Sequence, residues 1–232
     1  MLCRIADLFV EVPAAGGMDV RCKDYLTDSD ATPDIVIKEE SYSIDKWGDL
    51  PREHLEYMDS GNTFYFNLLK HSGMLLHSSA VELDGEAYLF SGPCGMGKST
   101  HTGIWKEVFP SARVFNDDKP ALRFIDGVWY AYGTPWCGKD GININLKVPL
   151  KAICFLRRGS ENKIRRLSKI EAAAAIFSQT TNRFGSERGL DYLTDMIDKL
   201  VCNVPVYELA NRPEPEAAIL SHGVMSGAES EM

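Results

Sequence analysis

The sequence lacks the features that would place the chain in a membrane or outside the cell. No run among its 232 residues approaches the roughly 18 consecutive apolar residues that a membrane-spanning helix needs. The beginning of the chain contains a short apolar run, but Asp7 and Glu11 interrupt it, so it has no apolar centre of the kind found in secretory signals. We therefore expect a cytoplasmic protein with no membrane partner.

Paired cysteines and an excess of positive charge are also missing. The six cysteines include no CxxC pair, which argues against zinc, and they are expected to be free and mostly buried thiols. Lys and Arg number 25 against 33 Asp and Glu, which gives a formal net charge of −8. Nucleic acid repels such a chain at long range, so nucleic acid is not an expected partner.

What the sequence does have is a globular composition, with 44% hydrophobic and 25% charged residues. Residues 1–60 contain only short strand-like runs, at 8–12 and 35–37, and are expected to form a small β-rich part. Residues 61–222 alternate helical patterns with hairpins, which predicts an α/β domain with a mixed sheet and flanking helices. Residues 223–232 are expected to be a mobile tail.

Periodicity and turn signals predict the individual elements of the chain. Gly61 is a potential break in the first of the expected helices. The expected helices cover 51–72, 98–109, 170–179, 188–202 and 215–222. The expected strands cover 74–83, 86–90, 112–115, 120–125, 128–132, 142–146, 150–156, 164–167 and 204–209, with a hairpin over 155–167.

A glycine-rich segment lies between the strand expected over 86–90 and the helix expected over 98–109. Its residues 92–99, GPCGMGKS, fit the phosphate-binding pattern G-x-x-x-x-G-K-[ST] at every defined position. Backbone N–H groups of such a loop converge on phosphate oxygens, and the helix N-terminus adds a favourable dipole. Lys98 is expected to bind the β- and γ-phosphates, and the Ser99 hydroxyl to ligate Mg²⁺. The expected nucleotide-binding residues are Gly92, Gly95, Met96, Gly97, Lys98, Ser99 and Thr100.

Two adjacent carboxylates, Asp117 and Asp118, follow the strand expected over 112–115. Taken alone, the pair is typical of a solvated turn. Its place one helix after a phosphate-binding loop favours a functional interpretation. One carboxylate would hold the metal, and the other would accept a proton from an attacking hydroxyl.

These motifs together resemble a known family over roughly residues 74–168. They are similar to the HPr kinase/phosphorylase-like P-loop kinases, whose fold is akin to that of ATP-dependent phosphoenolpyruvate carboxykinase. The similarity is greatest to the smaller HPr-kinase-related proteins found beside peptide-modification genes. The runs that carry it, in order, are LLHSSAVELDGEAYLFSGPCGMGKSTHTGIW, FNDDKPALR, WYAYGTPWCGKDGININLKVPL and FLRRGSENKIRRLS.

The resemblance implies roles for particular residues. His77 would lie near the transferred phosphate, although a histidine on a strand is also typical of a packed core. Asp118 would act as the base toward an acceptor serine, with Asp117 supporting it or the metal. The family carries a metal-ligand Glu where this sequence has none, and the nearest carboxylate, Asp140, is taken as a metal ligand beside Ser99 and Asp117.

Other residues have two interpretations each. Trp136 is either a core residue or part of the acceptor pocket. The family's later catalytic arginine could be Arg157, Arg158 or Arg183. The arginines of the hairpin expected over 155–167 form either a solvated turn or a site for phosphate or an acidic peptide.

The leading hypothesis is an ATP-dependent, Mg²⁺-requiring kinase that transfers the γ-phosphoryl group to a serine of a peptide or small protein. Its expected catalytic residues are Asp118, Asp117, His77 and Lys98. One alternative is a kinase of a small hydroxylated metabolite such as free serine. Another is a non-catalytic nucleotide-binding module in a peptide-modification operon. Full HPr kinases are hexamers, and that analogy predicts a homo-oligomer.

Overall fold

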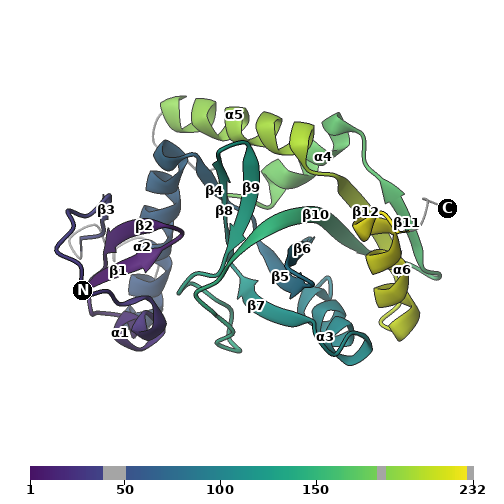
Figure 1. Ribbon diagram of the computed structural model, residues 1–232, viewed down its shortest axis with the longest axis horizontal. Coiled ribbons are helices and arrows are strands. Elements are labelled where there is room, and N and C mark those ends of the chain that lie inside the picture. The colour runs from purple at the N-terminus through teal and green to yellow at the C-terminus, as the bar shows by residue number, and fades with distance from the viewer. Residues whose placement is uncertain (39–50, 182–186, 229–232) are drawn as a thin grey trace.

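The structure is a computed structural model that describes residues 1–38, 51–181 and 187–228 (Figure 1). Within these ranges, no helix has both the length and the apolar character needed to cross a membrane. The helices are α1 (Met18–Arg21), α2 (Arg52–Leu68), α3 (Lys98–Val108), α4 (Lys169–Ser178), α5 (Glu187–Asn203) and α6 (Pro215–Ser226). The strands are β1 (Leu2–Ile5), β2 (Leu8–Glu11), β3 (Ile35–Val36), β4 (Gly73–Leu75), β5 (Ser78–Leu83), β6 (Glu86–Ser91), β7 (Arg113–Asp118), β8 (Ala121–Ile125), β9 (Val128–Tyr132), β10 (Lys147–Arg158), β11 (Lys163–Arg166) and β12 (Val206–Asn211).

A nine-stranded mixed sheet is built around the long strand β10. The first residues of β10 pair antiparallel with β9, and its later residues pair parallel with β6 and β12. Beyond β9 lie β8 and β4, and beyond β6 lie β5 and β7. Because β10 changes neighbours along its length, it joins an antiparallel half to a half that contains parallel strands. The expected mixed sheet is confirmed.

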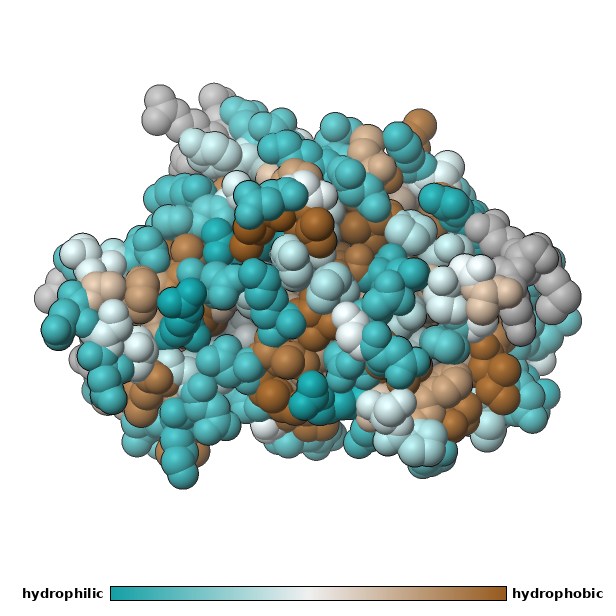
Figure 2. Space-filling model, in the orientation of Figure 1, coloured by the Kyte–Doolittle hydropathy of each residue, from teal (hydrophilic) through white to brown (hydrophobic). Residues whose placement is uncertain are grey.

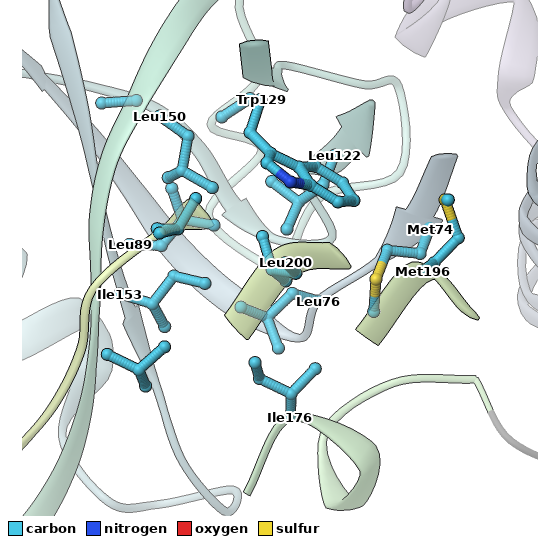
Figure 3. Close-up of a cluster of buried hydrophobic side chains, with 14 of the residues drawn as sticks. Met74, Leu76, Leu89, Leu122, Trp129, Leu150, Ile153, Ile176, Met196 and Leu200 are labelled. Carbon is cyan, nitrogen blue, oxygen red and sulfur yellow. The ribbon is translucent and has the colours of Figure 1, made fainter. Parts of the chain in front are cut away.

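Helices cover both faces of this sheet because the central strands are apolar on both sides. Leu89 and Ile153 are buried in one cluster with residues of α4 and α5 (Figure 3). Their strand neighbours Tyr88 and Cys154 are buried in another cluster with residues of α3 and α6. Side chains alternate between faces along a strand, so each central strand supplies both clusters. The expected α/β class with flanking helices is therefore confirmed.

The strand expected over 74–83 is two strands. β4 pairs with β8, whereas β5 pairs with β6 and β7. Leu76 and His77 lie between them, and the His77 amide donates to the carbonyl of Gln179, 2.8 Å away. This separation places His77 at a bend between two parts of the sheet rather than on a continuous strand.

Two other sequence expectations about strands are wrong. Residues 142–146 form no strand, because they touch β7 only through one bridge, Asn116 to Asn143, before the Leu146 carbonyl turns to the amide of Gly133. The hairpin expected over 155–167 does not exist, since β12 lies between β10 and β11 and pairs with both. A strand from the far end of the chain therefore separates the two arginine-bearing strands.

Helix α2 runs through Gly61 without the expected break, and it ends at Leu68. The missing side chain of Gly61 makes room for an indole, since a Cβ there would lie 2.9 Å from Cδ1 of Trp136. Trp136 is fully buried, stacks on Phe64 with ring centroids 4.7 Å apart, and donates from Nε1 to the hydroxyl of Ser60. The structure therefore assigns Trp136 to the core.

The structure does not follow the expected boundaries at residues 60 and 223. Residue 60 falls inside α2, whose buried face shares one apolar cluster with β1, β2 and β3. The expected tail begins too early, because α6 continues to Ser226 and buries Val224 and Met225. Only residues 229–232 of that tail lie outside the described residues. The face seen in Figure 2 is largely hydrophilic, with smaller hydrophobic areas between the polar residues.

Candidate functional site

The glycine-rich loop connects the end of β6 to the first residue of α3. Gly95 and Gly97 have φ angles of 77° and 95°, in the left-handed region that favours glycine. Gly97 occupies the N-cap position of α3, and no side chain caps this helix end. The first amides of α3 are therefore free of side-chain partners at the positive end of the helix dipole, where an anion binds favourably.

Lys98 folds back over this loop. Its ammonium group donates to the carbonyl oxygens of Gly92 and Pro93, at 2.9 and 3.4 Å. Burial lowers the pKa of Lys98, while the negative charges of Asp118 and Asp117 act in the opposite direction. The cation is thus held between the loop and the aspartate pair.

Ser99 and Asp117 bring α3 and β7 together. The Ser99 hydroxyl donates to Oδ2 of Asp117 at 2.8 Å, and Asp117 is buried with 8% of its surface exposed. Two adjacent ligands of an octahedral Mg²⁺ lie roughly 2.9 Å apart, given bonds of about 2.0–2.1 Å. The spacing of the two oxygens is therefore compatible with neighbouring positions around a magnesium ion.

Asp140 does not join this pair. It is exposed in the turn that the Gly141 amide closes by donating to the carbonyl of Gly138. Among the described residues, no group of three or more His, Cys, Asp or Glu side chains is arranged to hold a metal ion. Asp140 therefore does not complete a carboxylate cluster with Asp117 and Asp118.

Asp118 contacts His77 across the site. Oδ1 of Asp118 lies 3.0 Å from Nε2 of His77, and each side chain is about one-third exposed, at 30% and 31%. On the far side of the imidazole ring, Nδ1 lies 3.3 Å from Oε1 of Gln179. Gln179, at the C-terminal end of α4, thus orients the ring, and nothing in the sequence pattern indicated it.

Asp118 has an unusual backbone and a perturbed carboxyl group. Its φ is 110°, a conformation that residues with a Cβ rarely adopt. Burial alone would raise the pKa of Asp118, but the hydrogen bond from His77 and the charges of Lys119, His77 and Lys98 outweigh it and hold the pKa below its ordinary value. The carboxylate is therefore ionised at neutral pH and able to accept a proton.

Cys137 and Gly138 lie along the other side of the aspartate pair. Cys137 forms an antiparallel bridge with Asp118, and the Gly138 amide donates to the carbonyl of Asp117 at 2.6 Å. Tyr57 of α2 donates its hydroxyl to the carbonyl of Cys137 at 2.7 Å. The N-terminal part of the chain therefore borders the site, a role that no sequence motif predicted.

A pocket of about 350 Å³ opens beside the glycine-rich loop. Four expected nucleotide-binding residues, Gly95, Met96, Gly97 and Thr100, line it together with His101, Arg158, Gly159, Asn211, Arg212 and Pro213. The pocket lies next to the N-terminal end of α3, where the helix dipole favours an anion. Burial lowers the pKa of His101 to about 4, so this wall of the pocket is neutral at pH 7.

The arginines considered for a catalytic or binding role have different surroundings in the structure. Arg157 and Arg165 both pair with Glu208, at 3.1 and 3.2 Å. These pairs favour ordinary surface ion pairs over a site for phosphate or an acidic peptide. Arg158 lines the pocket beside the loop. Arg183 lies outside the described residues.

The six cysteines are free thiols. Four of them are buried, as expected, whereas Cys94 and Cys202 are exposed.

Comparison with known proteins identifies the family. No curated protein matches the sequence. One solved structure that matches is the Hpr(Ser) kinase/phosphatase from Coxiella burnetii, with 12% sequence identity, a TM-score of 0.40, and coverage of 66% of this chain and 89% of that one. The family model that matches is not that of the HPr kinases, which the motifs suggested, but that of SynChlorMet cassette protein ScmC, over residues 44–211. Since this match spans more than half of the chain, the protein belongs to the SynChlorMet cassette protein ScmC family.

Proposed function

We propose that this protein is an ATP- and Mg²⁺-dependent phosphotransferase that phosphorylates a hydroxyl group, that of a serine in a peptide or small protein. The observation that carries the proposal is the position of Asp118. This ionised carboxylate contacts His77 at 3.0 Å and directly follows Asp117, which is bonded to Ser99 at the start of α3. A base for the acceptor thus lies beside a suitable site for phosphate and metal.

The residues divide the reaction between them. Asp118 takes the proton of the acceptor hydroxyl while the acceptor oxygen forms a bond to the γ-phosphorus. The bond between that phosphorus and the bridging oxygen breaks, and ADP leaves with the electron pair. Lys98 and the amides at the start of α3 stabilise the negative charge on the phosphate oxygens. Ser99 and Asp117 would hold Mg²⁺, which neutralises phosphate charge when bound.

The geometry of the imidazole supports the assignment of Asp118 as the base. Gln179 and Asp118 contact opposite nitrogens of His77, so the ring has a fixed orientation toward the carboxylate. The hydrogen bond from His77 stabilises the ionised form of Asp118 and directs one of its oxygens. The second oxygen is then available for the acceptor hydroxyl.

Transfer of labelled phosphate tests the proposal. The protein is mixed with Mg²⁺, γ-labelled ATP and a serine-containing peptide encoded next to its gene. Asp118→Asn is expected to slow transfer by at least about a hundredfold, with ATP binding retained in calorimetry. Asp140→Asn is the control, since that carboxylate is exposed and outside the site.

Two outcomes would contradict the proposal. Equal transfer by wild type and Asp118→Asn would show that Asp118 is not the base. Tight ATP binding without transfer to any hydroxyl acceptor would favour a non-catalytic nucleotide-binding module.

A further inference from the structure

Two cationic side chains from distant parts of the sequence meet beside Asp118. Arg21 ends the short helix α1, and Lys119 directly follows β7. Both contact the ring of Tyr57: Cζ of Arg21 lies 4.6 Å from the ring centroid, and Nζ of Lys119 lies 4.7 Å from it. Both side chains are half-buried. We call Arg21, Lys119 and Tyr57 the cation cluster.

The cluster faces the same space as the carboxylate of Asp118. Asp118 and Cys137 form an antiparallel bridge, and such partners carry their side chains on one face with Cβ atoms roughly 4.5–5.5 Å apart. Nη1 of Arg21 donates to Sγ of Cys137 at 3.2 Å. The guanidinium group therefore reaches the residue directly opposite Asp118, while Lys119 is next to Asp118 in the chain.

The positive charge of the cluster is not balanced by a bonded carboxylate. Among the ion pairs of the described residues, none within 4.0 Å includes Arg21 or Lys119. A thiol is a weak hydrogen-bond acceptor, so the bond to Cys137 does not satisfy the guanidinium. Arg157 and Arg165, in contrast, both pair with Glu208.

The surrounding structure holds the cluster in place. The Arg21 carbonyl accepts from Nδ2 of Asn143 at 3.3 Å, and the Tyr57 hydroxyl donates to Cys137 at 2.7 Å. The carbonyl of Lys119 accepts from the hydroxyls of Tyr65 and Thr134. These bonds hold the backbone of Arg21 and Lys119 and the ring of Tyr57, against which both cations lie. The site is therefore preorganised, which lowers the entropic cost of binding.

We propose that Arg21 and Lys119 bind a carboxylate of the acceptor, so that the substrate carries a carboxylate close to the hydroxyl that is phosphorylated. This inference rests on the proposed phosphoryl transfer. The charges favour a carboxylate: two cations are balanced by one carboxylate together with Asp118, whereas a doubly charged phosphate would leave a negative excess. The planar fork of arginine also matches the two oxygens of a carboxylate. The source is either the α-carboxylate of a free amino acid or an acidic side chain next to a serine in a peptide.

Matched acceptor pairs test the inference. One pair is L-serine and L-serinamide, and the other is a peptide with a Ser-Glu step and the same peptide with Ser-Gln. Binding is measured by calorimetry in the presence of Mg²⁺ and a non-hydrolysable ATP analogue, and kcat/KM is measured with ATP. We expect the carboxylate member of one pair to be favoured by at least about tenfold, and that pair identifies the source.

Variants of Arg21 and Lys119 show whether these residues recognise the carboxylate or only support the fold. Arg21→Gln and Lys119→Met are expected to reduce the preference to about twofold or less, and Arg21→Lys to restore part of it. Arg157→Gln is the matched control, because it removes an arginine whose charge is already paired. Thermal melting shows whether each variant folds.

The outcomes distinguish this inference from the proposed function. Equal binding of both members in both pairs, or a preference that survives in the folded variants, would overturn the inference. A clear binding preference without phosphoryl transfer would support it and overturn only the proposed function.

Discussion

The hydroxyl of Ser99 lies 2.8 Å from Oδ2 of Asp117, which joins the first turn of α3 to the end of β7. These residues are eighteen positions apart in the sequence. The contact places two oxygen ligands next to the helix end where phosphate binds favourably. Under the proposed function, these local contacts and a divalent ion would bind the anionic nucleotide in spite of the net negative charge of the chain.

Nucleotide affinity should depend on magnesium. We expect the Kd for ATP, measured by calorimetry, to rise by at least about tenfold when Mg²⁺ is chelated. In Asp117→Ala, the same chelation should have a smaller effect, because one of the two ligands is already missing. Unchanged ATP affinity of the wild type in excess EDTA would show that Ser99 and Asp117 hold no metal.

Because the backbone of Asp118 has a positive φ, a glycine variant at this position should be more stable than an alanine variant, the reverse of the usual order. At an ordinary strand position, glycine is less stable than alanine by about 0.5–1 kcal/mol. At a φ of 110° we expect Asp118→Gly to be more stable than Asp118→Ala by about 1–2 kcal/mol, because glycine relieves the strain. The free energies of unfolding in urea measure this difference. The same pair of substitutions at Asp117 is the control and should follow the ordinary order.

Burial of His101 should make the fold sensitive to mild acid. The pKa of this residue is lowered from 6.5 to about 4, so below pH 6.5 the unfolded chain binds a proton that the folded chain does not. Stability is therefore lost as the pH falls from 6.5 toward 4, by about 2 kcal/mol at pH 5. Urea unfolding of wild type and His101→Gln at pH 7 and pH 5 measures this loss. If both proteins lose the same stability over that interval, His101 is not the responsible group.

The contact between α2 and Trp136 should make Gly61 intolerant of a methyl group. Alanine normally stabilises a helix interior relative to glycine. At Gly61, however, the new Cβ would lie 2.9 Å from the indole, and we expect a loss of about 1–3 kcal/mol.

Gly103 of α3 provides the matched control for that substitution. A Cβ at Gly103 would have no heavy atom within 4 Å, so Gly103→Ala should gain about 0.5–1 kcal/mol. Urea unfolding of both variants gives the comparison. A stabilising Gly61→Ala would mean that Trp136 does not pack against α2 as described.

Local signals predicted most of the regular structure. The hairpins at Asp84-Gly85 and Asp126-Gly127 form as expected, with positive φ at all four residues. These turns depend on the conformations available to adjacent residues, which the sequence displays directly. The helix after the glycine-rich loop begins at Lys98, as the motif predicted.

Pairings between distant segments could not be predicted in the same way. The run of strand-forming residues over 74–83 shows no break, yet it divides where its two parts join different neighbours. The hairpin expected over 155–167 does not form because β12 lies between β10 and β11 and pairs with both. Local sequence carries no information about which third strand will insert between two others.

The α/β class and the two short motifs that contain Lys98, Ser99, Asp117 and Asp118 are predictable from the sequence, because each motif is contiguous and its chemistry depends on residue type. The surroundings of Asp118, in contrast, depend on the tertiary fold. It brings His77 to one side from a bend in the sheet, and the cation cluster to the other from α1, α2 and the residue after β7. These groups meet through packing between segments far apart in the chain, and the spacing of residues along the sequence does not encode such contacts.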